Sequence, residues 1–291
     1  MTDHALPALG TVQGKVLFAS PMWSLVRLLV LFVVTGFIAI PLLSTALGAL
    51  KTKGDLRTNP FGLPTQWLWG NYADVLSRPQ VWEMLGNSLS IGIITVLITL
   101  AVAAPAAFAF AHLKFFGEQL LLNYLLLGLT FPFATAILPL FLQIRDLGLL
   151  DTHWGIILPQ VAFALASSVL LMRNAFRQVP DELVEAALID GASYARIFFS
   201  IVIPLSLPIL STVAIITFVN SWNNYLLPLV VLNSTAQYTW PLGLMQFQGL
   251  YATDWPLILT YVTVTIMPAI IVFVVAQRYI VAGLTAGAVK A

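Results

Sequence analysis

Hydrophobic residues fill this 291-residue chain in long blocks that a few charged residues separate. The apolar core of a bilayer is about 30 Å thick, and about 20 apolar helical residues cross it. Five intervals between neighbouring charged residues hold one such helix each, and the uncharged interval from Arg196 to Asp254 holds a helix and a polar loop. The pattern predicts six spans, with approximate boundaries at residues 24–47, 87–111, 119–143, 155–173, 199–226 and 257–281.

The distribution of Lys and Arg indicates an orientation. Six spans place both termini on one side, and the segments on that side carry Lys or Arg, whereas residues 227–256 on the opposite side carry neither. The positive-inside rule therefore predicts cytoplasmic termini. The loop after the first span argues against this orientation, since it contains Lys51, Lys53, Arg57 and Arg78.

This interpretation divides the chain at the water-facing segments. The parts are a cytoplasmic tail (1–23), a first span with an extracytoplasmic loop (24–86), a core of five spans (87–281) that contains the loop 174–198, and a cytoplasmic tail (282–291).

Composition supports a membrane protein and removes several other classes. The chain is 59% hydrophobic and 9% charged, whereas soluble domains carry about 25% charged residues. A net charge of +1 without a basic patch gives no reason to expect a nucleic-acid partner. The absence of cysteine excludes disulfides, thiolate metal sites and cysteine nucleophiles. We therefore expect an all-α polytopic membrane protein without a metal site or catalytic residues.

The most charged stretch runs from Arg173 to Arg196 and contains three basic and four acidic residues. Such a segment cannot lie in hydrocarbon, so it forms a water-facing loop between spans four and five. Pro180 predicts the start of a helix, Gly191 its end, and Ser193 the cap of a second helix that leads into span five. The apolar positions expected on one side of the first helix are Leu183, Val184, Ala187 and Leu188.

Within this stretch, Glu185-Ala186-Ala187 is followed by three residues, Gly191, nine residues and then Ile201-Val202-Ile203-Pro204. The spacing resembles the EAA loop of ATP-binding cassette (ABC) importer permeases, in which the last part reads I-x-L-P; Ile203 replaces the Leu. Trp222-Asn223-Asn224-Tyr225 and the C-terminal Gly283 to Lys290 resemble two weaker motifs of the carbohydrate-uptake branch. The chain is most similar there to the shorter of two paired permeases of the maltose-transporter type.

The resemblance implies a division of labour among subunits. ATP and magnesium would be bound by two separate ATPase subunits, so this chain would carry no cofactor and catalyse no reaction. A homologous second permease and an extracytoplasmic solute-binding protein, facing residues 233–254, would complete the complex in a prokaryotic plasma membrane. The residues implied in ATPase coupling are Glu185, Ala186, Ala187, Asp190 and Gly191, and those implied in a C-terminal contact are Gly283, Thr285, Gly287 and Lys290.

Polar residues at the end of span five are candidates for a solute pathway, namely Asn220, Trp222, Asn223 and Asn224. The three amides recur at helical spacing, and amides donate and accept hydrogen bonds as a hydroxyl-rich solute requires, while Trp can stack on a sugar ring. They could equally join helices or lie at the outer interface, and Gln143 and Gln160 are open to the same interpretations.

Two further classes of transporter remain as alternatives. The first is an ABC permease for a polyamine, an amino acid or a metal, and the second is a secondary transporter acting alone. No charged residue lies near the middle of a predicted span, which argues against coupling to an ion gradient. His112 and His153 lie near span ends without catalytic partners, so both are assigned to the membrane interface.

Overall fold

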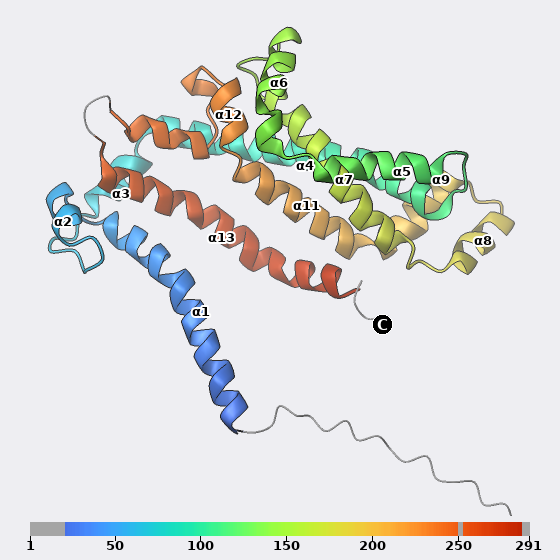
Figure 1. The fold of residues 1–291 in the computed structure, drawn as a ribbon, viewed down its shortest axis with the longest axis horizontal. Helices are drawn as coiled ribbons and strands as arrows, with labels where there is room; N and C mark the ends of the chain where they lie inside the picture. Colours follow the sequence, from blue (N-terminus) through green and yellow to red (C-terminus); the bar gives the residue numbers. More distant parts are fainter. Residues whose placement is uncertain (1–20, 250–252, 287–291) are drawn as a thin grey trace, which may run out of the picture.

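The computed structural model describes residues 21–249 and 253–286, and this part of the chain contains helices but no β-strand (Figure 1). In chain order the elements are α1 (Pro21–Gly48), α2 (Lys53–Thr58), α3 (Gly70–Leu76), α4 (Pro79–His112), α5 (Glu118–Leu127), η1 (Gly128–Thr130), α6 (Phe133–Asp146), α7 (Trp154–Phe176), α8 (Asp181–Ile189), α9 (Tyr194–Ile197), η2 (Phe198–Val202), α10 (Ile203–Leu205), α11 (Leu207–Trp222), α12 (Leu226–Val231), η3 (Thr235–Gln237), η4 (Pro241–Phe247) and α13 (Trp255–Ala286).

The centre of the fold is a bundle in which the 34-residue α4 packs along both α7 and α11. Small side chains at Ala103, Ala104 and Ala107 are buried on α4, where they face the buried Val169 and Met172 of α7. Small residues let membrane helices approach closely, which increases dispersion contacts between their backbones. Helix α13 lies beside α11, and its first half also contacts α1 and α3.

The predicted span at 119–143 is broken. Helices α5 with η1 on one side and α6 on the other meet at an angle of 102°. Phe131 and Pro132 have extended backbone, with ψ angles of 116° and 123°. Pro132 lacks a backbone N–H and disfavours helical conformation in the residue before it. The segment predicted as a span at 119–143 is therefore not one continuous helix, and the proline explains why.

The predicted span at 199–226 is also bent, by 78° between α10 and α11. Ser206 leaves the helical region at φ −103° and ψ 12°, and prolines at 204 and 208 flank it. The preceding turn, η2, is a π-helix, a form that often accompanies irregular positions in helices. The helical segment that begins with α9 therefore runs at an angle of 78° to α11.

By length and composition, three described helices can cross a membrane: Trp23–Gly48, Pro79–His112 and Trp154–Phe176. The number rises to five if each bent pair forms one span, and α13 contains a further apolar segment at Trp255–Pro268. The all-helical membrane class is thus supported, while the total of six spans stays a prediction.

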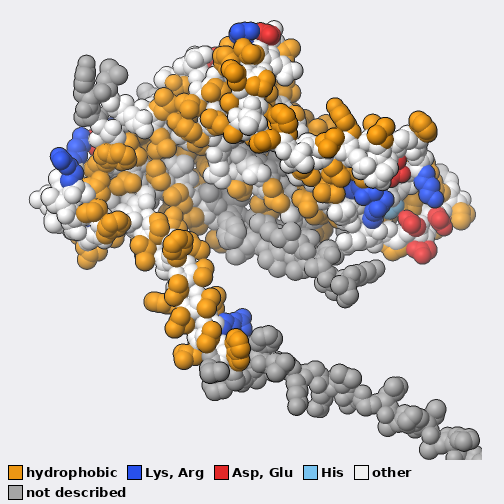
Figure 2. All heavy atoms as spheres, in the orientation of Figure 1, with side chains coloured by type: hydrophobic (Ala, Val, Ile, Leu, Met, Phe, Trp, Pro, Cys, Tyr) orange, Lys and Arg blue, Asp and Glu red, His pale blue; other side chains and the backbone are white. Residues whose placement is uncertain are grey.

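Helix α1 stands away from the bundle (Figure 1). None of its most apolar 18-residue window is buried within this chain, and hydrophobic side chains cover its visible surface in Figure 2. Lipid or another protein must therefore surround this helix, because apolar surface of this extent is not stable in water.

Candidate functional site

Helix α8 and its two boundaries form the first candidate region. Asp181, the first helical residue, follows Pro180 as the sequence predicts. At the other end, Gly191 has a left-handed backbone (φ +78°), and the Ala192 amide donates to the Ala187 carbonyl at 2.9 Å. This arrangement satisfies carbonyls that the helix would otherwise leave free. Sequence pattern and structure therefore agree on a short helix with a fixed end.

The helix that follows begins as predicted too. The Ser193 hydroxyl accepts a hydrogen bond from the Arg196 amide at 3.3 Å and so caps α9. The turn between α8 and α9 is consequently held by hydrogen bonds at both sides. A short, ordered connection therefore joins α8 to α9.

The exposed surface of α8 carries the residues expected to couple to an ATPase. Glu185, Ala186, Asp190 and Gly191 are exposed, whereas Ala187 is half-buried. Figure 2 shows acidic side chains gathered at the end of the molecule where Figure 1 places α8. This surface is acidic, contains small residues and lies at the edge of the molecule, so a partner can approach it.

The apolar side predicted for α8 is only partly covered. Val184 is buried in the bundle core and Ala187 packs against that core. Leu183 and Leu188 remain 46% and 38% exposed, and Ile189 is 86% exposed. A helix of nine residues that touches the bundle by one edge cannot bury a wider stripe. The four apolar positions expected on one side of α8 therefore do not all pack against the bundle, and the uncovered side chains add apolar area to the surface.

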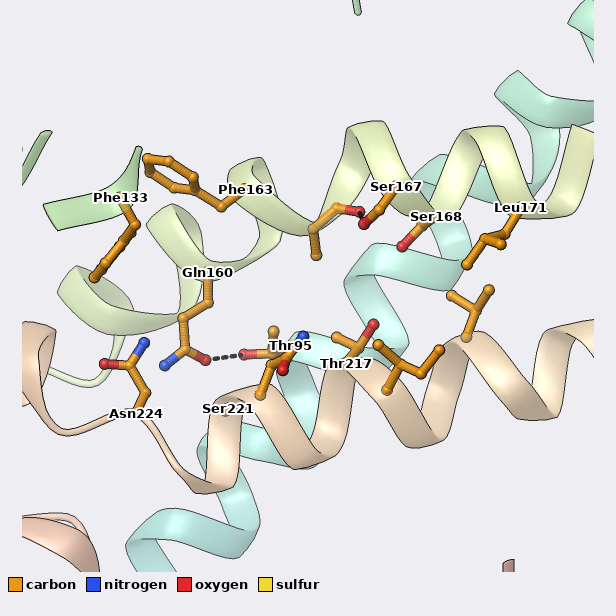
Figure 3. A pocket seen from close by; sticks show the side chains of 14 residues that line it. Thr95, Phe133, Gln160, Phe163, Ser167, Ser168, Leu171, Thr217, Ser221 and Asn224 are labelled. Carbon is orange, nitrogen blue, oxygen red and sulfur yellow. Dashed lines mark hydrogen bonds between the residues drawn. The ribbon is translucent and has the colours of Figure 1, made fainter. Parts of the chain in front are cut away.

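The second candidate region is a cavity of about 300 Å³ between α4, α7 and α11 (Figure 3). Such a volume lies at the lower end of the range for small-molecule sites. Eight of its fourteen lining residues are uncharged and polar, and the other six are apolar: Thr95, Gln160, Ser167, Ser168, Thr217, Asn220, Ser221 and Asn224, together with Phe133, Phe163, Ala164, Leu171, Val213 and Ile216. None of these side chains carries a charge.

Gln160 projects from α7 into this cavity (Figure 3). Its Oε1 lies 3.4 Å from the Thr95 Oγ1 on α4, which gives a long hydrogen bond across the two helices. Thr95 and Gln160 are 1% and 9% exposed, so both polar groups are held in a largely dry wall. Buried polar groups of this kind are costly unless they find partners, and these two groups are partners of each other.

One wall of the cavity depends on the break before α6. Phe133, the first residue of α6, meets Phe163 of α7 edge to face, with ring centroids 5.0 Å apart at 80°. A straight helix through 119–143 would continue the direction of α5 instead of turning by 102° here. The proline that interrupts the predicted span thus brings an aromatic side chain to the cavity.

The structure separates the four polar residues predicted at the end of span five. Asn220 and Asn224 line the cavity, but Asn223 is exposed and does not. Helix α11 ends at Trp222, and the Asn224 Oδ1 accepts a hydrogen bond from the Leu227 amide at 3.2 Å, at the start of α12. The prediction of one continuous helical face therefore fails, because the helix ends before Asn223.

Trp222 packs in a second hydrophobic core instead of lining the cavity. It is 4% exposed, and its ring stacks on Phe218 at 5.8 Å and on Trp240 at 6.1 Å between centroids. Trp240 stacks in turn on Tyr261 of α13. In this conformation Trp222 connects α11 to Trp240 and, through Trp240, to α13. Its ring cannot stack on a solute.

Several cavity residues were not among the sequence candidates. Thr95, Ser167, Ser168 and Thr217 are isolated small polar residues in apolar helices. Their hydroxyls can bond to their own helix, so sequence alone gives no reason to select them. The signal that could have found them is their shared burial beside Gln160, which requires the packing of three helices.

The comparisons with known proteins show the family and the fold of the chain. Residues 100–285 match the family described as "Binding-protein-dependent transport system inner membrane component". The chain belongs to this family of permeases. The match includes α7, α8, α11 and nearly all of α13, and it therefore covers the α8 region and every cavity residue except Thr95.

Curated relatives extend the similarity over most of this permease. The diacetylchitobiose uptake system permease protein of Streptomyces coelicolor is 35% identical over 254 residues, which cover 86% of this chain and 83% of the relative. The arabinooligosaccharides transport system permease protein of Halalkalibacterium halodurans is 35% identical and covers 89% and 94%. The trehalose transport system permease protein of Mycobacterium tuberculosis is 35% identical and covers 88% and 94%.

A solved structure supports the fold of the permease. The chain matches part of a bacterial ABC transporter involved in the import of the acidic polysaccharide alginate, with a TM-score of 0.78 and 24% identity. The match covers 89% of this chain and 96% of the other. At this identity the likeness shows the arrangement of helices.

The C-terminal residues predicted to contact an ATPase lie at the boundary of the described structure. Gly283 and Thr285 belong to the last turns of α13, while Gly287 and Lys290 lie outside the described residues. The proposed role of this tail in the permease therefore stays a prediction.

Proposed function

We propose that this permease is the transmembrane subunit of an ATP-driven importer that takes up a neutral sugar or oligosaccharide. The observation that carries the proposal is the cavity between α4, α7 and α11, which is lined by amides and hydroxyls without a charged group. The names of the curated relatives, which include trehalose and arabinooligosaccharide permeases, support the same solute class.

The lining of the cavity favours a neutral solute over the alternatives. A polyamine would need carboxylates, and an amino acid would need a cationic partner for its carboxylate. The cavity residues supply neither. Gln160, Asn220 and Asn224 instead offer both donors and acceptors, which match successive hydroxyls, and Phe163 offers an apolar ring surface.

Coupling to ATP hydrolysis takes place at α8. Its exposed Glu185 offers a carboxylate to a partner's Arg or backbone amides, while Ala186 and Gly191 permit close approach of the partner. Asp190 adds a second exposed carboxylate, and Ala187 keeps the helix against the bundle. The ATPase subunits bind ATP and magnesium and displace α8, so this chain needs no cofactor.

The complete importer contains a homologous permease, two ATPase subunits and an extracytoplasmic solute-binding protein in a prokaryotic plasma membrane. The permease is oriented with α8 and both termini in the cytoplasm. The basic residues beside α8 support this orientation, because Lys and Arg concentrate on the cytoplasmic side. The uncovered α1 accords with a partner in the membrane, since it buries none of its most apolar window within this chain.

Uptake into vesicles tests the function. ATP enclosed in the vesicles, on the same side of the membrane as α8, should drive uptake of radiolabelled trehalose, diacetylchitobiose or arabinobiose. It should do so only when the ATPases and the binding protein are present. Uptake that needs no ATPase and follows an ion gradient would contradict the proposal and indicate a secondary transporter. Uptake of putrescine or an amino acid in preference to the sugars would contradict the proposed solute class.

A pair of variants tests the cavity. Both amides are exposed, but Asn220→Leu removes one that lines the cavity, while Asn223→Leu removes one that lies outside it. We expect Asn220→Leu to lower the transport rate severalfold, since a hydrogen bond to the solute contributes about 0.5–1.5 kcal/mol net. Asn223→Leu should stay near the wild-type rate. Equal rates for both variants would exclude Asn220 from the pathway.

A further inference from the structure

His112, which the sequence assigns to the membrane interface, is instead buried where three helices meet. It is the last residue of α4, and its side chain is 1% exposed. Its Nε2 lies 3.0 Å from the carbonyl oxygen of Phe176 at the end of α7. Its Nδ1 lies 3.5 Å from the Oδ1 of Asp181, the first residue of α8. One imidazole ring therefore faces α4, α7 and α8 together.

The two contacts of the ring differ in kind. A backbone carbonyl only accepts hydrogen bonds, so the Phe176 contact assigns a proton to the His112 Nε2. The Nδ1 is buried and makes no hydrogen bond in this conformation, although a carboxylate faces it. A second proton, taken up from water at Nδ1 to give the imidazolium cation, and a shift of a few tenths of an ångström would close that bond. The α7 contact is thus made, and the α8 contact is open.

The ends of α4 and α7 are fixed to each other at a second point. Arg173, one turn before Phe176, donates from its Nε to the carbonyl oxygen of Phe110 at 2.9 Å. Its Nη2 lies 4.0 Å from the Oε1 of Glu118 at the start of α5. In contrast, the described residues contain no ion pair or side-chain hydrogen bond between α8 and α4 other than the pair of His112 with Asp181.

The other end of this connection is the solute cavity. Thr95 lies on α4, 17 residues before His112, which is about 25 Å along a helix axis. Thr95 in turn contacts Gln160. A displacement of α8 that is transmitted to the end of α4 therefore acts on a helix that lines the cavity.

We propose that His112 is a positioning residue that transmits the movement of α8 to α4 through its contact with Asp181. The bond from Nδ1 to the carboxylate closes when an ATPase presses α8 toward the bundle and opens when α8 moves away. His112 touches neither solute nor ATP. This inference rests on the proposed function, since it assigns a route from the ATPase surface to the cavity.

Hydrogen exchange in the purified transporter complex tests the contact without knowledge of the solute. Asp181→Asn removes the carboxylate that faces His112, and Glu182→Gln removes a neighbouring exposed carboxylate in the same first turn. Both variants remove one charge from the helix terminus, so the dipole effect is matched. We expect Asp181→Asn to accelerate exchange of α8 amides about two- to fivefold in the ATP-bound complex, as for a partly exposed pair, and Glu182→Gln to change it little.

A double variant distinguishes this pair from a general loss of structure. His112→Asn should accelerate exchange as much as Asp181→Asn, and the combination should accelerate it no further. Equal exchange in Asp181→Asn and Glu182→Gln, or multiplying effects in the double variant, would overturn the proposed contact.

Transport per ATP hydrolysed tests the consequence. Asp181→Asn and His112→Asn should lower the amount of trehalose, diacetylchitobiose or arabinobiose moved per ATP severalfold, while the ATPase remains bound. An unchanged ratio would overturn transmission through His112. If the wild-type complex moves none of the three sugars with ATP, the proposed solute class fails, while the exchange experiment still decides the contact.

Discussion

The glycine after α8 offers a sharp test of docking. Gly191 has φ +78°, where a Cβ costs about 1–2 kcal/mol. A Cβ built on it meets no atom of this chain within 4 Å, so no steric clash adds to that cost. Gly191→Ala therefore weakens the turn by a factor of about 5–30 through the backbone alone. Gly191→Asn carries a larger side chain, but Asn tolerates this conformation better.

The two variants consequently separate backbone strain from contact with a partner. If an ATPase packs against Gly191, both variants should lose ATPase when the tagged permease is purified with its partners. If only the turn conformation matters, Gly191→Ala should lose more than Gly191→Asn. Gly86→Ala is the control, because it is an exposed helical glycine with open space around it.

The amount of ATPase per permease can be measured by quantitative gel analysis, and uptake of labelled sugar in the same vesicles. Normal amounts of bound ATPase and full uptake in both variants would refute the assignment of α8 as the docking helix. Loss in Gly86→Ala as well would show that the assay reports general damage instead.

Two further predictions concern stability. The pKa of Asp151 is lowered, first by a hydrogen bond from the Ser234 hydroxyl and then by one from the Ser234 amide. The ionised carboxylate therefore stabilises the fold at neutral pH. This contribution disappears as the pH falls through the lowered pKa. The melting temperature of Asp151→Asn should therefore lie below that of wild type at pH 7, and the difference should shrink below about pH 4; a constant difference would contradict this. Gly155→Ala places a Cβ 2.5 Å from the Leu149 carbonyl oxygen and should lower the free energy of unfolding by about 1–3 kcal/mol. Thermal unfolding in detergent compares it with Gly128→Ala, whose Cβ makes only an ordinary contact. Equal stability of the two variants would contradict the prediction.

The sequence predicted the class of the protein and the local structure of α8 because both depend on nearby residues. Apolar blocks of membrane length leave only a few arrangements for a backbone without water. Pro180, Gly191 and Ser193 each act within one helical turn, so the boundaries that they predict are those observed.

Prolines lie inside both of the predicted spans that are broken, but the sequence did not show which prolines break a helix. Many membrane helices continue through a proline with a kink, because neighbours restore the lost hydrogen bonds. Pro105 lies within α4 in this way, whereas Pro132 stands at a turn of 102°. Whether a proline bends or breaks a helix depends on what packs beside it.

The amino-acid sequence by itself determined that this chain is a helical membrane protein with one short, water-facing helix. Only the tertiary structure decided which polar side chains share a cavity. Asn220 and Gln160 lie on different helices, and Trp222, next to Asn223 in the chain, packs in another core. His112 likewise meets Asp181 across 69 positions of sequence. Such contacts arise from the packing of whole helices, in which each side chain's direction depends on where its helix bends and ends.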